Sequence, residues 1–277
     1  MGLDDLSVVL PVYNEAYILR YSLPSLLRLY AGEYIVILDR PRDYSRELIL
    51  HYFKRFNIKT ILNIIEYHNK SPWRNRLNYL YHIGILEASR KYVLLAQADV
   101  ILDPLKIERY YRYNGLVSYS MNYLNPYLTI LKRIKTVGRR GFSGTLSFPR
   151  KHYLRNPMEP DSPLGFDEEI RRIFNNQYLY VRDAGFNLRP YKDDYRLGKM
   201  KRILGMNLLK VLLWSMLHLK PKVFVGYLNG MRYEKYEKRP LSLYERGFKV
   251  ENYKAVSYTH LRAHETEADL VCRLLLE

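Results

Sequence analysis

The hydrophobic positions of this chain form short apolar runs that alternate with amphipathic segments. The first run, Leu6–Val12, is continuous and typical of a strand buried on both faces of a parallel sheet. Residues Asn14–Tyr30 repeat Ile and Leu at helical spacing, and Pro24 predicts a kink or split in that helix. The alternation continues, with strands predicted at Tyr34–Leu38, Thr60–Ile65 and Tyr92–Ala96 and helices at Asp43–Phe56 and Pro72–Arg90.

Strands that alternate with helices at this spacing predict βαβ units with right-handed crossovers. The fold class is therefore α/β, with a mostly parallel central sheet flanked by helices. After Asp103 the alternation loosens, and we expect strands at Val117–Tyr123, Thr145–Phe148 and Tyr178–Leu188 and helices at Asp167–Asn175 and Leu208–Leu219.

Three of the predicted strands are each followed by a polar cluster, at residues 13–15, 39–43 and 97–99. Ligands of open α/β sheets bind beyond the carboxyl ends of the strands, so one shared ligand site is the interpretation that we favour. Three independent helix caps are the alternative, because Asn14 and Asp43 are residue types that cap helices.

The sequence contains neither of the common glycine-rich phosphate loops, G-x-G-x-x-G and Walker A. Phosphate charge would then have to be met by arginines or by a metal ion on carboxylates. Asp99 follows an apolar strand and suits an oxygen-preferring cation such as Mg²⁺ or Mn²⁺. Arg74, at the start of a predicted helix, is a candidate for binding a diphosphate, with a solvated helix start as the alternative.

Four segments together resemble the family 2 glycosyltransferases, which have the GT-A fold, a Rossmann-like single domain. They are Ser-Val-Val-Leu-Pro-Val-Tyr-Asn-Glu at 7–15 and the segments at 37–43, 92–104 and 165–169, and the resemblance covers roughly residues 5–190. It implies an enzyme that moves a sugar from a nucleotide-diphosphate donor to a hydroxyl of a glycan or lipid-linked acceptor. The implied reaction is metal-assisted and inverts the anomeric carbon.

The resemblance also implies roles for single residues. The nucleotide pocket would be lined by Pro11, Tyr13, Glu15, Asp39 and Gln97, with Asp39 accepting a hydrogen bond from the base. Asp99 would bind the metal that bridges the diphosphate, Asp167 would be the general base at the acceptor hydroxyl, and Arg189 would be a further phosphate contact.

Three positions depart from the family pattern. Gln97 replaces the first Asp of the Asp-x-Asp motif, Asn187 stands where relatives often have a metal-binding His, and Phe166-Asp167 replaces a Glu-Asp pair. Acidic residues also suit the first turn of a helix through its dipole, which is the alternative for Asp167. A catalytically weak relative that binds nucleotide sugars without turnover is therefore the first alternative to an active enzyme.

The formal charge of +17, from 45 Lys and Arg against 28 Asp and Glu, calls for an anionic partner or surface. Residues 189–254 hold 16 basic and 6 acidic residues, outside the strand-end clusters. The charge and the 28 tyrosines suggest a nucleic-acid-binding protein as a second alternative, to which we give less weight because the positive charge concentrates after residue 189, outside those clusters.

No apolar run reaches the ~20 residues of a membrane span, and the acidic N-terminus differs from a secretory signal, so we expect a cytoplasmic protein. The apolar segment Leu208–Leu219, flanked by lysines, leaves peripheral attachment to an anionic membrane surface open. A core helix that covers the sheet is the alternative, which we slightly favour.

The predicted organisation is a GT-A-like domain at 1–190, a basic helical extension at 191–256 and a tail at 257–277. The tail resembles a translated sequencing adapter and contains the only cysteine, Cys272. We expect the tail to be non-native and the true C-terminus to be missing, with a short native helix as the alternative.

Overall fold

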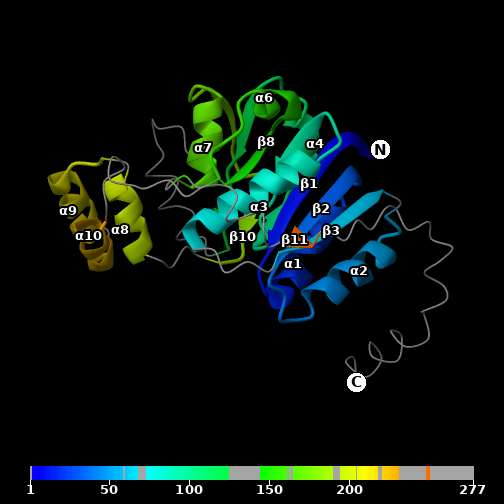
Figure 1. Ribbon diagram of the computed structural model, residues 1–277, viewed down its shortest axis with the longest axis horizontal. Helices are drawn as coiled ribbons and strands as arrows, with labels where there is room; N and C mark the ends of the chain where they lie inside the picture. The colour runs from blue at the N-terminus through cyan, green and yellow to red at the C-terminus, as the bar shows by residue number, and fades with distance from the viewer. Residues whose placement is uncertain are drawn as a thin grey trace.

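The computed structural model describes residues 2–58, 60–67, 73–124, 144–160, 162, 165–189, 194–203, 205–217, 220–230 and 248–249. A large central sheet with helices on both faces forms the main body of the molecule (Figure 1). This architecture confirms the predicted α/β class. The predicted tail at 257–277 lies outside the described residues.

The first half of the sheet is a regular βαβ arrangement. Its strands are β1 (Leu3–Val12), β2 (Ala31–Asp39), β3 (Ile61–Tyr67) and β4 (Tyr92–Leu95), and its helices are α1 (Ala16–Leu27), α2 (Ser45–Arg55) and α3 (Trp73–Glu87). The four strands are parallel, in the spatial order β3-β2-β1-β4. The sequence pattern predicted every one of these elements, and only their ends differ.

Side chains of β1 alternate between two cores, one on each face of the sheet. Leu6, Val8 and Leu10 pack with residues of α1 and α2, whereas Val9 packs on the other face with residues of α3 such as Ile85. All five side chains are almost fully buried. Burial on both faces explains why β1 reads as a continuous apolar run.

Helix α1 continues through Pro24, so the predicted split of this helix is wrong. A proline cannot supply the N–H that would bond the carbonyl four residues earlier, which here belongs to Arg20. The hydroxyl of Tyr52 in α2 donates to that carbonyl instead, at 3.2 Å. The replacement bond satisfies the group that Pro24 leaves without its helical partner.

Beyond β4 the sheet becomes mixed. The main sheet continues with β8 (Thr145–Pro149), β6 (Leu116–Tyr119) and β9 (Tyr178–Val181), and its other edge is β11 (Phe248–Lys249), giving the order β11-β3-β2-β1-β4-β8-β6-β9. The helices of this part are α4 (Pro104–Tyr110), α6 (Arg150–Arg155) and α7 (Phe166–Ile173). The hydrophobic pattern predicted β8 and α7 but not α4 or α6.

A second, three-stranded sheet has the order β5-β10-β7, with β5 (Val100–Leu102), β10 (Gly185–Asn187) and β7 (Asn122–Tyr123). The single strands predicted at 117–123 and 178–188 are therefore wrong, because each is divided between the two sheets. Asp183, at φ 54°, turns the chain between β9 and β10. A Cβ at Gly185 would lie 2.0 Å from the carbonyl oxygen of Ile101, so only glycine lets β10 approach β5 this closely.

Helices α8 (Asp194–Ile203), α9 (Leu208–Leu217) and α10 (Pro221–Leu228) lie to one side of the sheet (Figure 1). They share a small buried cluster of their own around Val211, Val223 and Tyr227. Helix α9 packs against α10 and does not cover the sheet, so the interpretation of this segment as a sheet-covering core helix is wrong. None of the described helices combines the length and apolar character needed to cross a bilayer.

Candidate functional site

The carboxyl ends of β1 and β4 form the point where the strand order of the parallel sheet reverses. β1 pairs with β2 on one side and β4 on the other, and its last bond to the β4 side runs from the Ala96 N–H to the Val9 carbonyl, at 2.9 Å. The backbone nitrogen of Pro11, two residues after Val9, also points to the β4 side of β1. Because β4 has ended by that position, the missing N–H of the proline removes no hydrogen bond between the strands. Open α/β sheets bind their ligands at such reversal points.

Tyr13 and Asp39, two of the predicted nucleotide-binding residues, lie near the same buried arginine. The guanidinium of Arg76, from α3, forms an ion pair with the Asp39 carboxylate, and the side chains are only 1% and 4% exposed. Burial lowers the pKa of Arg76 to about 10, which still leaves it charged at neutral pH. Arg40 lies 3.7 Å from Asp39 through its Nε, and its guanidinium lies 5.4 Å from the Tyr13 ring centroid.

Three other predicted residues meet at the reversal point as a charged cluster, Glu15–Arg189–Asp99. The Nη2 of Arg189 donates to Glu15 Oε2, and its Nε lies 3.6 Å from Asp99 Oδ2. The Arg189 side chain is 48% exposed. Burial by itself would lower the pKa of Arg189, but the hydrogen bond that it donates to Glu15 and the charges of Glu15 and Asp99 raise it, so the guanidinium is firmly charged.

The small second sheet brings Arg189 to this position. β10 pairs antiparallel with β5, with Asn187 opposite Val100, and the Leu188 N–H donates to the Asp99 carbonyl at 2.8 Å. The residue after Leu188 is therefore delivered beside the loop that follows β4. Asn187 itself lies in β10 beside that same loop.

Asp43 has a structural role at the starts of α1 and α2, and Asn14 holds the loop between β2 and α2. The Asp43 carboxylate accepts hydrogen bonds from the Ala16 N–H (2.9 Å) and the Ser45 N–H (3.1 Å), which begin α1 and α2. The Asn14 side-chain oxygen Oδ1 accepts from the Arg42 N–H in the loop between β2 and α2, at 2.7 Å. The cap interpretation thus holds for Asp43 but not for Asn14, which bonds a loop N–H, whereas Glu15, Asp39 and Asp99 pair with arginines.

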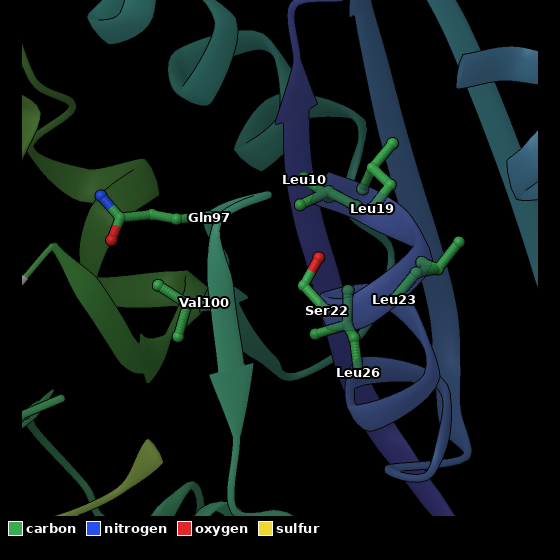
Figure 2. Close-up of a pocket in the computed structure, with 7 residues that line it drawn as sticks. All are labelled: Leu10, Leu19, Ser22, Leu23, Leu26, Gln97 and Val100. Carbon is green, nitrogen blue, oxygen red and sulfur yellow. The ribbon is translucent and has the colours of Figure 1, made fainter. Parts of the chain in front are cut away.

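The side-chain amide of Gln97 points away from helix α1 (Figure 2). Its stem helps to line a small apolar hollow with Leu10 and leucines of α1, while its carboxamide points away from them (Figure 2). A Cβ at Gly144 would lie 2.6 Å from the Gln97 Nε2 and 3.1 Å from Phe166 Cζ. The absence of a side chain at Gly144 is what makes room for the amide near the start of α7.

Asp167 lies in the first turn of α7, and burial raises the pKa of its carboxyl. The residue before it, Phe166, packs against Tyr81 with ring centroids 4.2 Å apart. The hydroxyl of Tyr81 donates to the Ala96 carbonyl at 2.7 Å, and burial together with the charges of Asp99 and Asp167 raises its pKa well above the ordinary value. Tyr81 therefore lies within electrostatic reach of both carboxylates.

Sequence reasoning did not identify Tyr81 as a residue of this region, and it considered Arg76 only as part of a basic cluster at the start of a helix. Both belong to α3, where the apolar helical pattern gives no signal for the contact of Tyr81. A signal for Arg76 existed, because the cluster Trp73-Arg74-Asn75-Arg76 is basic in an otherwise apolar helix. The predicted residue Arg74 is in the first turn of α3, and its side chain lies outside the described residues.

The residues after β4 offer a divalent cation only one carboxylate, that of Asp99. Among the residues that the structure describes, no three His, Cys, Asp or Glu side chains gather as a metal-binding group. Mg²⁺ is commonly held by one or two carboxylates together with substrate phosphates. Asp99 fits a cation of that kind, which would share the carboxylate with Arg189.

Comparison with known families gives one match. A family model described as glycosyl transferase family 2 matches residues 7–155, which is more than half of the chain. The matched segment contains Glu15, Asp39 and Asp99. No curated protein sequence is significantly similar to the chain.

Solved structures with a similar fold include S. aureus TarS 1-349, with a TM-score of 0.52, 12% identity and coverage of 76% of this chain and 66% of that one. The same fragment in complex with UDP has a TM-score of 0.50 and 15% identity, and the match covers 75% of this chain and 67% of that one. The mannosyltransferase PcManGT from Pyrobaculum calidifontis, in complex with GDP-Man and Mn²⁺, has a TM-score of 0.52 and 16% identity, and the match covers 81% of this chain and 69% of that one. At these identities the similarity establishes a shared fold, and this chain spans about two thirds of the TarS fragment.

Proposed function

This chain belongs to glycosyl transferase family 2, and from that premise we propose that it transfers a sugar from a nucleoside-diphosphate donor to an acceptor hydroxyl. The Glu15–Arg189–Asp99 cluster is the observation that carries the proposal. A charged, half-exposed guanidinium at the strand-order reversal suits a diphosphate, because arginine binds phosphate oxygens through paired N–H groups. The UDP in TarS and the GDP-Man in PcManGT support the donor class.

We assign the nucleoside to the side of Asp39. The ion pair with the buried Arg76 fixes the Asp39 carboxylate in place, so that it can accept a hydrogen bond from a base N–H. The Tyr13 ring is 43% exposed and can stack on the base. Pro11, at the end of β1, would contribute the floor of this pocket.

We assign the diphosphate to the other side of the reversal, where the half-exposed Arg189 contacts the partly buried carboxylates of Glu15 and Asp99. Arg189 would exchange its carboxylate contacts for phosphate oxygens. A bound Mg²⁺ or Mn²⁺ would supply further positive charge to the leaving group, as the Mn²⁺ in PcManGT suggests. Asp99 would hold that ion together with the phosphates, and the Gln97 amide would bond the ribose or a phosphate.

We assign general-base catalysis to Asp167. A carboxyl with a raised pKa is a better proton acceptor than an ordinary aspartate, once the pH is high enough to ionise it. The acceptor oxygen would bond to the anomeric carbon as the bond from that carbon to the diphosphate breaks, and the hydroxyl proton would pass to Asp167. Attack opposite the leaving group inverts the anomeric centre. The resemblance to the family supports a glycan or lipid-linked acceptor.

A catalytically weak relative is a second candidate, favoured by the neutral Gln97 and by the contact between Asp99 and Arg189. The variant Gln97→Asp distinguishes the two. A gain of about tenfold or more in metal-dependent transfer would indicate a degraded site, and unchanged transfer would indicate that Asp99 suffices. Gln177→Asp is the matched control, because Gln177 is the only other glutamine and is exposed after α7.

The proposal is tested by a thermal-shift panel on the full chain with UDP- and GDP-sugars, each with Mn²⁺, Mg²⁺ or chelator. Binding to the native state raises the melting temperature by mass action, so no acceptor is needed. We expect stabilisation by one nucleotide class, and a larger shift with metal. If no nucleotide sugar stabilises the chain under any of these conditions, the donor assignment is wrong.

A further inference from the structure

Helices α9 and α10 carry the same surface pattern. Each has a stripe of three exposed apolar side chains at positions n, n+4 and n+7 and an exposed lysine at n+1. In α9 the stripe is Leu209, Leu213 and Met216 with Lys210, and in α10 it is Pro221, Val225 and Leu228 with Lys222. The exposed fractions of the leucines and of Met216 range from 51% to 65%.

These stripes are not the faces that hold the helices together. Val211 of α9 and Val223 and Tyr227 of α10 are the buried residues of the helical unit. Val211 and Val223 lie about half a turn from the stripes of their helices, and Tyr227 lies about a third of a turn from its stripe. The helices lie at one side of the molecule, with α9 farther from the sheet than α10 (Figure 1). Repeated apolar stripes exposed to water mark an interaction surface.

The charges around the stripes are almost all positive. Residues 194–230 contain seven Lys and Arg and a single acidic residue, Asp194. Lys210 and Lys222 are exposed, and each lies beside its stripe about 100° around the helix. Lys201 lies 4.3 Å from the Trp214 ring, and burial lowers its pKa. The surface therefore pairs apolar side chains with exposed cations.

We propose that the exposed faces of α9 and α10 dock this protein on the surface of an anionic lipid bilayer. A bilayer interface accepts both parts of the pattern, because apolar side chains enter the acyl boundary while lysines meet lipid phosphates. A nucleic acid would engage the lysines and leave the leucines in water. The attachment is peripheral, and it does not depend on the donor site.

Vesicle co-sedimentation of the full chain tests this docking. Vesicles of phosphatidylcholine alone are compared with vesicles that also contain phosphatidylserine. We expect binding to the anionic vesicles, weakened about tenfold or more in Leu213→Gln/Met216→Gln because its two apolar anchors are lost. Lys210→Glu/Lys222→Glu should also bind less, and high salt should weaken the wild type.

Matched controls use exposed residues of the sheet domain. Leu105→Gln removes a leucine that is 75% exposed on α4, and Lys151→Glu reverses an exposed charge on α6, and neither should change vesicle binding. Unchanged melting temperatures would exclude misfolding of the α9 and α10 variants. Equal binding by all variants would overturn the proposal. So would the absence of vesicle binding together with self-association that Leu213→Gln/Met216→Gln abolishes, which would make a second copy the partner.

Discussion

Two arginine–carboxylate clusters lie at the same edge of the sheet and differ in their access to water. Asp39 and Arg76 are 4% and 1% exposed, whereas Arg189 is 48% exposed beside Glu15 and Asp99. The buried pair is fixed by the surrounding core. The second cluster can exchange partners more easily, since its guanidinium is half exposed to solvent. The difference indicates that one cluster sets the shape of the nucleoside side and the other is the part that responds to ligand.

The free energies of the two clusters should differ accordingly. Removing one partner of a buried ion pair leaves an uncompensated charge in the core, which typically costs about 3–5 kcal/mol. An exposed pair typically contributes about 0–1 kcal/mol. Equal contributions of Arg76 and Arg189 to stability would contradict this difference between the two clusters.

The largest expected effect is on Arg76. We expect Arg76→Met to lower the free energy of unfolding by about 3–5 kcal/mol, because the buried Asp39 would keep only the more distant and partly exposed Arg40 as a partner. Arg189→Met should lower it by about 1 kcal/mol or less. Urea unfolding of the two variants measures both values. Similar losses in the two variants would remove the distinction between a structural and an exchangeable cluster.

A double substitution sharpens this result. In Asp39→Leu/Arg76→Met both charges are gone, so no ion remains buried without a partner. We expect the double variant to recover a large part of the stability lost in Arg76→Met. If the double variant is as unstable as the sum of the single variants, packing of the Arg76 side chain, not its charge, is what matters.

Asp167 lies outside both clusters, and its loss should act on the chemical step. We expect Asp167→Asn to lower kcat about a hundredfold. Burial raises the pKa of Asp167, so wild-type activity should fall as the pH decreases through that raised value, and this acidic limb should be absent from the residual activity of the variant. The pH profile of kcat/KM measures the limb.

The same shift affects stability with a definite sign. The folded pKa of Asp167 exceeds the unfolded one, so its proton stabilises the fold at low pH, and this contribution is lost as the pH rises through the folded value. Glu169 is the matched control, since burial also raises its pKa while Ser162 donates to it at 2.5 Å. Glu169→Gln should change stability and keep the acidic limb of activity. If the acidic limb of activity disappears in Glu169→Gln instead, the assignment of Asp167 as the general base is wrong.

The smallest expected effect is at Tyr81. Tyr81→Phe keeps the ring on Phe166 and removes the hydrogen bond to the Ala96 carbonyl, which should cost about 1 kcal/mol of stability. Because this bond positions the loop that carries Asp99, kcat should also fall a few-fold. Tyr119→Phe, which loses a 2.9 Å bond to Ser147 in the core, should cost similar stability without changing kcat. Equal kcat values in the two variants would contradict a positioning role for Tyr81.

The regular half of the fold could be predicted because its signals are local. Four buried parallel strands each give an apolar run, and the helices between them give a helical period. The division of the later part into β9 and β10 could not be predicted, since one apolar segment supplies both strands and only the turn at Asp183 divides it. Short helices such as α6 carry too few residues for a clear period.

The candidate site divides in the same way. Glu15, Asp39 and Asp99 follow strands, so their common edge could be inferred from the alternation alone. The contact of Arg189 with Glu15 joins residues 174 positions apart through the antiparallel pairing of β10 with β5. Such a pairing leaves no local signal. The direction of the Gln97 amide depends on the missing side chain of Gly144, which is likewise a tertiary property.

The most direct test of the account compares a nucleotide with its nucleoside. Calorimetric titrations would measure UDP, GDP, uridine and guanosine on the wild type and on Arg189→Gln. We expect the variant to bind the preferred nucleoside diphosphate about tenfold or more weakly, because charge-assisted hydrogen bonds to phosphate are lost, and to bind the nucleoside unchanged. An equal loss for both ligands, or no loss for either, would contradict the assignment of the Glu15–Arg189–Asp99 cluster to the diphosphate.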